Sequence, residues 1–185
     1  MVEEWQSPTL QRLSSGLSAE LLASMTFETF DPQGMAVDEE GMQNLGRALQ
    51  LAQGFARQPD GWLVFTGAPG TGKTHLAAAI ANACQARGQA VYFVVVPDLL
   101  DHLRATYSPD SRVTYDELFE AIRAAPLLVL DDLGAHSSTP WAQEKLYQLM
   151  NHRYNGRLPT VITTNLTLDE LDDRLSSRML DQRVS

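Results

Sequence analysis

Short apolar segments alternate with helical patterns along this chain. Four of them predict strands, at residues 62–66, 90–96, 127–130 and 160–164. In the second segment the apolar residues run without a break, which is typical of a strand covered on both faces in a parallel sheet. Strands that alternate with helices are joined by right-handed crossovers. The pattern therefore predicts an α/β fold, built as a three-layer α/β/α sandwich around a parallel sheet.

Helical periodicity fills the stretches between these strands. Residues 41–58 place leucine, alanine and phenylalanine side chains on one face, as an amphipathic helix does. A second helix is expected from about Gly72 to Arg87, and Gly88 ends it. Further helices are expected after Pro97, over residues 115–125 and over residues 141–154, with a loop at residues 108–111.

The beginning of the chain shows no such alternation. Residues 1–40 are polar, contain turn signals and hold one short helical candidate near residues 18–22. We expect residues 1–40 to form an N-terminal arm or linker, and residues 41–185 to form the domain.

Composition narrows the class of protein. The 185 residues are 44% hydrophobic, enough to bury one core, and the single cysteine excludes a disulfide framework. The acidic, polar start is unlike a signal sequence, and no apolar run approaches the ~20 residues that cross a bilayer. We therefore expect a cytoplasmic protein with no membrane contact. The net charge of −9 argues against a broadly basic nucleic-acid-binding surface, but not against a local basic strip.

A glycine-rich segment directly after the first strand is the most specific motif. Residues 67–74 match G-x-x-x-x-G-K-T, and a helix-forming sequence follows them. Glycines allow the backbone to wrap around phosphates with its N–H groups turned inward. The lysine supplies a charge for the β- and γ-phosphates, and the threonine hydroxyl supplies a ligand for Mg²⁺. The predicted nucleotide-binding residues are Gly67, Gly70, Thr71, Gly72, Lys73, Thr74 and His75.

Two acids, Asp131 and Asp132, follow the third strand. Ligands of open α/β sheets bind beyond the carboxyl ends of the strands, so both acids should face the same crevice as Lys73. We assign Asp131 to Mg²⁺, together with Thr74, and Asp132 to polarising the attacking water. A plain surface turn is the alternative, because aspartate is common in turns.

A polar residue, Asn165, ends the fourth strand. If the first, third and fourth strands are neighbours, Asn165 lies beside the γ-phosphate. It would then hydrogen-bond the phosphate or the nucleophilic water, which is a positioning role in catalysis. Capping of the following turn explains the residue nearly as well.

Two arginines near the end of the chain, Arg174 and Arg178, share a helix face because they are four residues apart. An arginine supplied across a subunit boundary can stabilise the charge that develops on a transferring phosphoryl group. Pairing within the helix, with Asp172 or Asp173, is the alternative.

Taken in order, these motifs resemble the Walker A, Walker B, sensor 1 and arginine-finger elements of AAA+ ATPases. More narrowly, residues 27–180 resemble the bacterial replicative helicase loaders of the DnaC/DnaI type and the related IstB-type transposase helper ATPases. Residues 26–31, Thr-Phe-Glu-Thr-Phe-Asp, and residues 151–154, Asn-His-Arg-Tyr, support the narrower match.

The resemblance implies mechanical work driven by ATP and Mg²⁺. Such proteins bind ATP between neighbouring subunits of an open helical assembly, engage single-stranded DNA and pass a replicative DNA helicase onto it. By similarity, residues 27–31 lie near the adenine, Arg178 reaches a neighbour's γ-phosphate, and Arg174 supports the subunit contact. The helical insertion between the second and third strands resembles an element that contacts DNA, with Arg104 and Arg123 as its candidate residues.

Three departures from the family pattern change the expectation. Asp132 stands where many AAA+ proteins carry glutamate, and its shorter arm suits slow, assembly-dependent hydrolysis. The helicase-binding N-terminal domain of the loaders is absent or reduced to the arm. The chain ends at Ser185, where the family usually continues into a fifth strand. With the AAA+ strand order 5-1-4-3-2, that loss leaves the first strand as an open edge, so we expect a C-terminally truncated domain.

Other functions stay open on the sequence alone. A transposase helper shares every motif with a helicase loader. A P-loop small-molecule kinase needs an acceptor pocket and usually a basic lid after the fourth strand, where residues 166–173 are acidic instead. A nucleotide switch with negligible hydrolysis would fit an Asp132 that cannot support catalysis, or the loss of the fifth strand.

Overall fold

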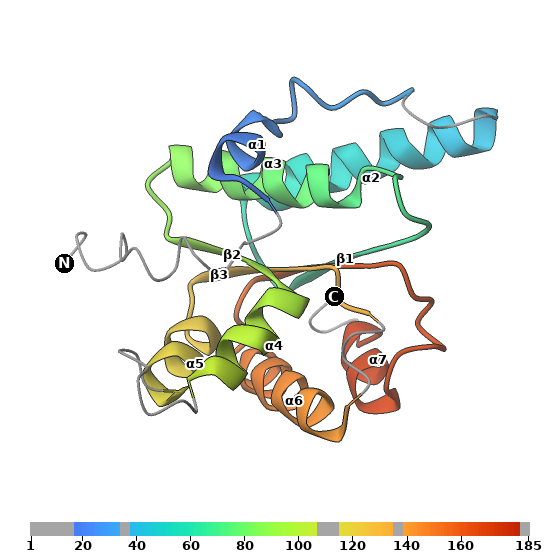
Figure 1. Ribbon diagram of the computed structural model, residues 1–185. Coiled ribbons are helices and arrows are strands. Elements are labelled where there is room, and N and C mark those ends of the chain that lie inside the picture. Colours follow the sequence, from blue (N-terminus) through green and yellow to red (C-terminus); the bar gives the residue numbers. More distant parts are fainter. Residues whose placement is uncertain (1–16, 34–37, 107–114, 135–138, 182–185) are drawn as a thin grey trace.

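A parallel β-sheet divides the molecule into layers (Figure 1). The computed structural model describes residues 17–33, 38–106, 115–134 and 139–181, and within them four strands pair in the order β1-β4-β3-β2. The predicted parallel sheet and the predicted order of these strands are therefore confirmed. The strands are β1 (Trp62–Thr66), β2 (Val91–Val95), β3 (Leu127–Asp131) and β4 (Thr160–Thr164).

Three helices cover one face of the sheet (Figure 1). They are α1 (Ala19–Ser24), α2 (Glu39–Arg57) and α3 (Lys73–Ala86). The alanine-rich α3 lies closest to the strands, and its buried Leu76 and Ile80 belong to the same apolar cluster as Val129 and Val161 of the sheet. Small alanine side chains let a helix approach a sheet closely. Because α3 is buried within this layer, it is apolar almost all round.

The segment before the domain packs directly on α3. The Asn82 side chain donates hydrogen bonds to the carbonyl oxygens of Leu22 and Met25, at 2.8 and 2.9 Å. Phe30, a few residues further on, is only 9% exposed and joins the core cluster beneath α3. The described part of the predicted arm therefore contributes to the core. Residues 1–16 and 34–37 of that arm lie outside the described residues.

Four helices cover the opposite face (Figure 1). They are α4 (Val96–Ala105), α5 (Tyr115–Arg123), α6 (Pro140–Asn155) and α7 (Asp173–Met179). Their apolar side chains form a second, larger cluster with the lower face of the sheet, centred on the fully buried Leu128, Leu130 and Ile162. The strands are therefore buried on both faces, as a sandwich of three layers requires.

A buried arginine joins α6 to the entry of two strands. Arg153 is completely buried, and its guanidinium donates to the Thr160 hydroxyl at 2.8 Å and to the carbonyl oxygens of Ala125 and Pro159 at 2.8 and 2.6 Å. A fourth bond goes to the carbonyl of Arg123 at 3.1 Å. Burial lowers the pKa of Arg153 to about 10, so the side chain stays charged at neutral pH.

Several boundaries differ from the sequence expectation by one or two residues, and two of them have a clear cause. The strand predicted to end at residue 96 ends at Val95, and α4 begins at Val96. Pro97 explains the early start, because a proline in the first helical turn has no N–H to leave unpaired. In turn, α2 begins at Glu39, before the expected Gly41, because the Asp38 carboxylate accepts the Gly41 N–H and caps the helix.

The loop predicted at residues 108–111 lies outside the described residues. Among the helices that the structure describes, none combines the length and the apolar character that a membrane crossing demands.

Candidate nucleotide-binding site

The phosphate loop connects β1 to α3 through a backbone that only glycine adopts without strain. Gly67, Gly70 and Gly72 have φ angles of 144°, 81° and 88°, all in the range that L-residues avoid. At Gly72 a side chain is excluded twice, since a Cβ there would also lie 2.8 Å from Cε2 of Phe30. The loop therefore delivers the N-terminus of α3, with its unpaired N–H groups, to the carboxyl edge of the sheet.

Lys73 lies across the mouth of this loop. Its ammonium donates to the carbonyl oxygens of Gly67 and Ala68, at 2.8 and 2.7 Å. Burial lowers the pKa of Lys73, while the carboxylates of Asp131 and Asp132 oppose that shift. The cation thus bonds the loop and is close enough to both acids to interact with them electrostatically.

Two side chains from separate elements converge on Asp131. Thr74, at the start of α3, donates its hydroxyl to Asp131 Oδ1 at 2.9 Å, and Thr163 of β4 donates to the same oxygen at 2.6 Å. The carboxyl is only 4% exposed, and burial raises the pKa of Asp131 against the lowering effect of the two hydroxyls. The structure therefore brings together the two residues assigned to Mg²⁺, Thr74 and Asp131.

Asp132 turns its side chain toward Asn165. It has a positive φ of 57°, which is uncommon outside glycine, and its backbone N–H donates to the Thr163 hydroxyl at 2.9 Å. Asn165 Nδ2 donates to Asp132 Oδ1 at 3.1 Å. Because β4 lies between β1 and β3, Asn165 reaches Asp132. A role of Asn165 in catalysis required these three strands to be neighbours, and they are.

A cavity of about 360 Å³ opens beside the phosphate loop. Its walls come from the loop, from the segment before α2 and from α2 itself. His75, at the start of α3, anchors the segment: its Nε2 bonds the Thr26 carbonyl at 2.8 Å, and its ring meets Phe30 edge to face at 5.4 Å. The lining residues are Thr29, Phe30, Asp31, Gly41, Asn44, Leu45, Gly70, Thr71, Gly72 and His75.

Sequence reasoning missed two parts of this site. Thr163 was assigned only to a strand, although its hydroxyl bonds both Asp131 and the backbone of Asp132. Asn44 and Leu45 were assigned only to a helix, although they line the cavity. The signal that points to Thr163 is a threonine near the end of a buried strand, since a buried hydroxyl needs a partner.

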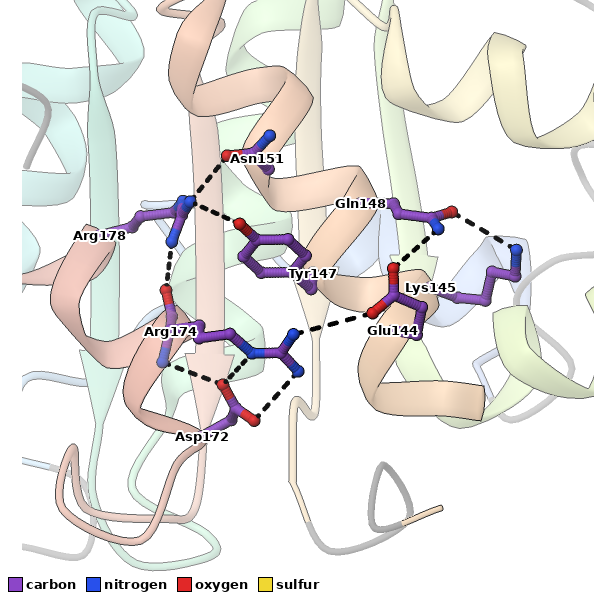
Figure 2. Close-up of polar contacts among 8 residues, drawn as sticks. All are labelled: Glu144, Lys145, Tyr147, Gln148, Asn151, Asp172, Arg174 and Arg178. Carbon is purple, nitrogen blue, oxygen red and sulfur yellow. Dashed lines mark hydrogen bonds and ion pairs between the residues drawn. The ribbon is translucent and has the colours of Figure 1, made fainter. Parts of the chain in front are cut away.

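The two arginines of α7 lie against α6 (Figure 2). Arg174 pairs with Asp172 at 3.1 Å and with Glu144 at 3.7 Å. Arg178 donates to the Tyr147 hydroxyl at 3.1 Å and to Asn151 Oδ1 at 2.7 Å. Arg174 thus makes the expected local pair with Asp172, and both arginines also reach across to α6.

The two candidate DNA contacts are each paired within their own helix. Arg104 bonds Asp101 at 2.9 Å on α4 and lies over the Trp141 ring at 5.0 Å. Arg123 bonds Glu120 on α5 through two nitrogens, at 2.5 and 2.7 Å. The structure does not bring these two side chains into contact with each other.

The fold and the site define a P-loop nucleotide-binding protein of the AAA+ type: a parallel 1-4-3-2 sheet, a glycine loop after β1, two acids at the end of β3 and a polar residue after β4. The profile of the family described as "IstB-like ATP binding protein" matches residues 10–184. The chain belongs to this family, which confirms the resemblance drawn from its motifs.

Several known proteins are similar to this chain in sequence and fold. The replicative helicase loader DnaC of Escherichia coli (strain K12) is 28% identical over 193 residues, covering 96% of this chain and 77% of that protein. The crystal structure of the DnaC helicase loader aligns with a TM-score of 0.71 and 26% identity, over 87% of this chain and 94% of that one. The crystal structure of DnaI aligns with a TM-score of 0.69 and 25% identity, over 86% and 88%.

Proposed function

We propose that this protein is an ATPase that loads a replicative DNA helicase. The observation that carries the ATPase part is the meeting of three groups from distant parts of the chain at one edge of the sheet. These groups are the phosphate loop, the two acids at the end of β3, and Asn165 after β4. The similarity to proteins named as helicase loaders supports the loading part.

Thr74 and Asp131 have the chemistry of a Mg²⁺ site. A hydroxyl and a carboxylate are the hard oxygen ligands that Mg²⁺ prefers, and these two are held 2.9 Å apart. When bound, Mg²⁺ would neutralise part of the charge on the β- and γ-phosphates. Lys73 would exchange the loop carbonyls for phosphate oxygens, which bind an ammonium more strongly than neutral carbonyls do.

Asp132 and Asn165 would act on the attacking water. Asp132 would accept its proton, and the amide of Asn165, which bonds Asp132, would fix the water in line with the γ-phosphate. The aspartate arm is one methylene shorter than glutamate, so we propose slow turnover.

The cavity beside the phosphate loop would hold the nucleotide base. Phe30 and Leu45 provide apolar walls, and Thr29 and Asn44 provide polar groups at its edge. Gly72 belongs to the phosphate loop and also lines the cavity. A nucleotide with its phosphates on the loop would therefore place its base in the adjoining cavity. ATP is the nucleotide that the family's description names.

Arg178 would complete the site of a neighbouring copy. It makes no contact with the Lys73 or Asp131 groups of its own chain among the described residues, so its charge would act in trans. Arg174 would support the same subunit contact through its exposed pairs. The protein would therefore associate with itself through the ATP site.

Single-stranded DNA and the helicase would be the macromolecular partners, in the cytoplasm. We propose Arg104 and Arg123 as DNA contacts because they lie on the α4–α5 insertion. A phosphate would have to share each guanidinium with Asp101 or Glu120, so each contact would be weak on its own.

A transposase helper is a second candidate, and the family description favours it, because the matching profile carries the IstB name. The two functions differ in partner rather than in chemistry. Binding of the purified protein to a replicative helicase from the same organism, with a transposase in parallel, separates them.

The ATPase assignment is tested by measuring the rate of ATP hydrolysis per protomer against protein concentration, with and without single-stranded DNA. A site completed in trans predicts a rate that rises with concentration and rises further with DNA. Mixing Arg178→Ala protein with Lys73→Ala protein should restore part of the activity, because hybrid interfaces pair an intact loop with an intact arginine. A rate per protomer that is independent of concentration would contradict the shared site.

A further inference from the structure

Arg178 and Arg174 lie one helical turn apart on α7 and are held in opposite ways (Figure 2). Arg174 is paired with the carboxylates of Asp172 and Glu144. Arg178 donates only to neutral acceptors: the Arg174 carbonyl at 2.6 Å, the Tyr147 hydroxyl at 3.1 Å and Asn151 Oδ1 at 2.7 Å. In the part of the chain that the structure describes, no carboxylate forms an ion pair with Arg178.

Aromatic rings complete the surroundings of this guanidinium. Its central carbon lies 4.8 Å from the ring centre of Tyr147 and 5.5 Å from that of Tyr154. The carboxylate at this end of α7, Asp181, accepts the Tyr154 hydroxyl rather than Arg178. Ring faces attract a cation without cancelling its charge.

The distinction between neutral and charged partners decides what an arginine offers to an incoming anion. A carboxylate satisfies the N–H groups and also neutralises the cation, so a phosphate would have to displace it. At Arg178 a hydroxyl, an amide oxygen and a carbonyl accept bonds from the two terminal nitrogens and fix the plane of the guanidinium without adding a negative charge. The buried Nε has no partner among the described residues. Arg178 is therefore held by neutral acceptors and forms no ion pair among the described residues, whereas Arg174 is held by two carboxylates.

We propose that Tyr147 and Asn151 of α6 are positioning residues that hold Arg178 in place without neutralising it, so that it can act on an anionic phosphate of a neighbouring copy. The inference rests on the proposed role of Arg178 in trans. Tyr147 and Asn151 also line an open groove of about 560 Å³ along α6, so the side chains that hold the arginine border accessible surface.

The substitution that tests this inference is Asn151→Asp. It keeps the size of the side chain and the acceptor for Arg178, and it adds a carboxylate that pairs with the guanidinium. A purely structural role would be preserved or strengthened by the change. We expect an unchanged or higher melting temperature, an unchanged KM for ATP, and a kcat about tenfold lower in the assembled protein.

Two further variants calibrate this result. Asn155→Asp makes the same chemical change one turn along α6 in the same groove, where the structure shows no bond to Arg178, and should leave kcat within about twofold. Tyr147→Phe keeps the ring and removes the hydroxyl acceptor, and should lower kcat about threefold without changing the KM. An equal loss of kcat in Asn155→Asp and Asn151→Asp would overturn the inference.

The same assay separates failure of this inference from failure of the proposed function. Arg178→Ala should lower kcat by about 100-fold or more if the arginine acts in trans. If it does so while Asn151→Asp turns over like wild type, the neutral surroundings are irrelevant and only the inference falls. If Arg178→Ala is fully active, both the inference and the proposed role of Arg178 in trans are wrong. If Asn151→Asp has a lower melting temperature than wild type, the double variant Asn151→Asp/Arg178→Ala decides the case. It should be as active as Arg178→Ala alone, and a further loss of activity would overturn the inference.

Discussion

Thr163 uses one hydroxyl to organise both acids of the candidate site. It donates to Asp131 Oδ1 at 2.6 Å and accepts the Asp132 N–H at 2.9 Å. Burial alone favours the protonated form of Asp131, and the donated hydrogen bond favours the charged form, so the two effects on the Asp131 pKa oppose each other. The threonine thus makes a buried carboxylate compatible with Mg²⁺ binding, which needs the charged form.

Thr163→Val should therefore destabilise the protein in a pH-dependent way. Loss of the donor raises the Asp131 pKa further, so the folded state suffers most where Asp131 is ionised. We expect the free energy of unfolding to fall by about 1–3 kcal/mol at pH 7. The difference from wild type should shrink as the pH is lowered and Asp131 takes up a proton. Urea unfolding across this pH range measures both quantities.

Thr164→Val is the matched control for that experiment. The neighbouring threonine is equally buried, but its hydroxyl donates to the Leu133 carbonyl, which does not titrate. Its loss should therefore cost a similar free energy at every pH. A pH-dependent cost in both variants would show that Asp131 is not the cause.

At the scale of elements, Arg153 ties α6 to the sheet at the edge opposite the candidate site. Its four bonds reach the residues just before β3 and the start of β4, whereas the acids and Asn165 lie at the opposite ends of these strands. Several backbone carbonyls at this edge would otherwise be buried without a donor. The arginine therefore serves stability, and the site should not depend on its charge.

We expect Arg153→Met to lower the free energy of unfolding by about 3 kcal/mol or more, because the carbonyls of Ala125 and Pro159 would be left without donors. The free energy of unfolding of Arg153→Lys should lie between those of wild type and Arg153→Met, since one ammonium cannot span four acceptors. Urea denaturation measures the stability, and ATP titration of the folded variants should give the wild-type affinity. Arg47→Met, at an exposed position of α2, should cost less than about 0.5 kcal/mol.

The elements were largely predictable because their signals are local. The span Trp62–Thr66 follows from its apolar run, and the turn into α3 follows from Gly67, Gly70 and Gly72. The meeting of Asp132 and Asn165 was predictable only as a condition on strand order, which the pairing of β4 with β3 now meets.

Contacts that depend on exact packing were not predictable in the same way. The opposite settings of Arg174 and Arg178 follow from how α7 lies on α6, and no spacing in the sequence specifies that angle. The placement of Asn44 in the cavity wall depends likewise on how α2 packs against α3.

At the scale of the whole molecule, nucleotide binding should couple to global stability, because the site draws on the phosphate loop, β3 and β4 at once. At an ATP–Mg²⁺ concentration 100 times the dissociation constant, the free energy of unfolding should rise by about 2.7 kcal/mol. For a protein of this size the melting temperature should rise by about 5–10 °C. Thermal unfolding with and without ATP–Mg²⁺ measures the shift.

Lys73→Ala should abolish that shift, because the ammonium that would bind the phosphates is gone. Lys145→Ala removes a lysine of α6 that contacts Gln148 and the Tyr115 ring, and it should leave the shift unchanged. An equal shift in wild type and Lys73→Ala would show that ATP stabilises the protein without using the phosphate loop.

Arg178 bonds its own helix and α6 rather than the phosphate loop of its own chain, so an assembly built through this arginine would have a direction. Each protomer would offer an arginine on one side and need one on the other, so copies would add head to tail. In an open chain of such copies, the protomer at one end would hold a nucleotide that no arginine reaches, and the protomer at the other end would present an arginine with no nucleotide to meet. The number of complete sites would always be one fewer than the number of subunits. Short assemblies would therefore be disproportionately inactive, and growth of the chain would itself switch the enzyme on.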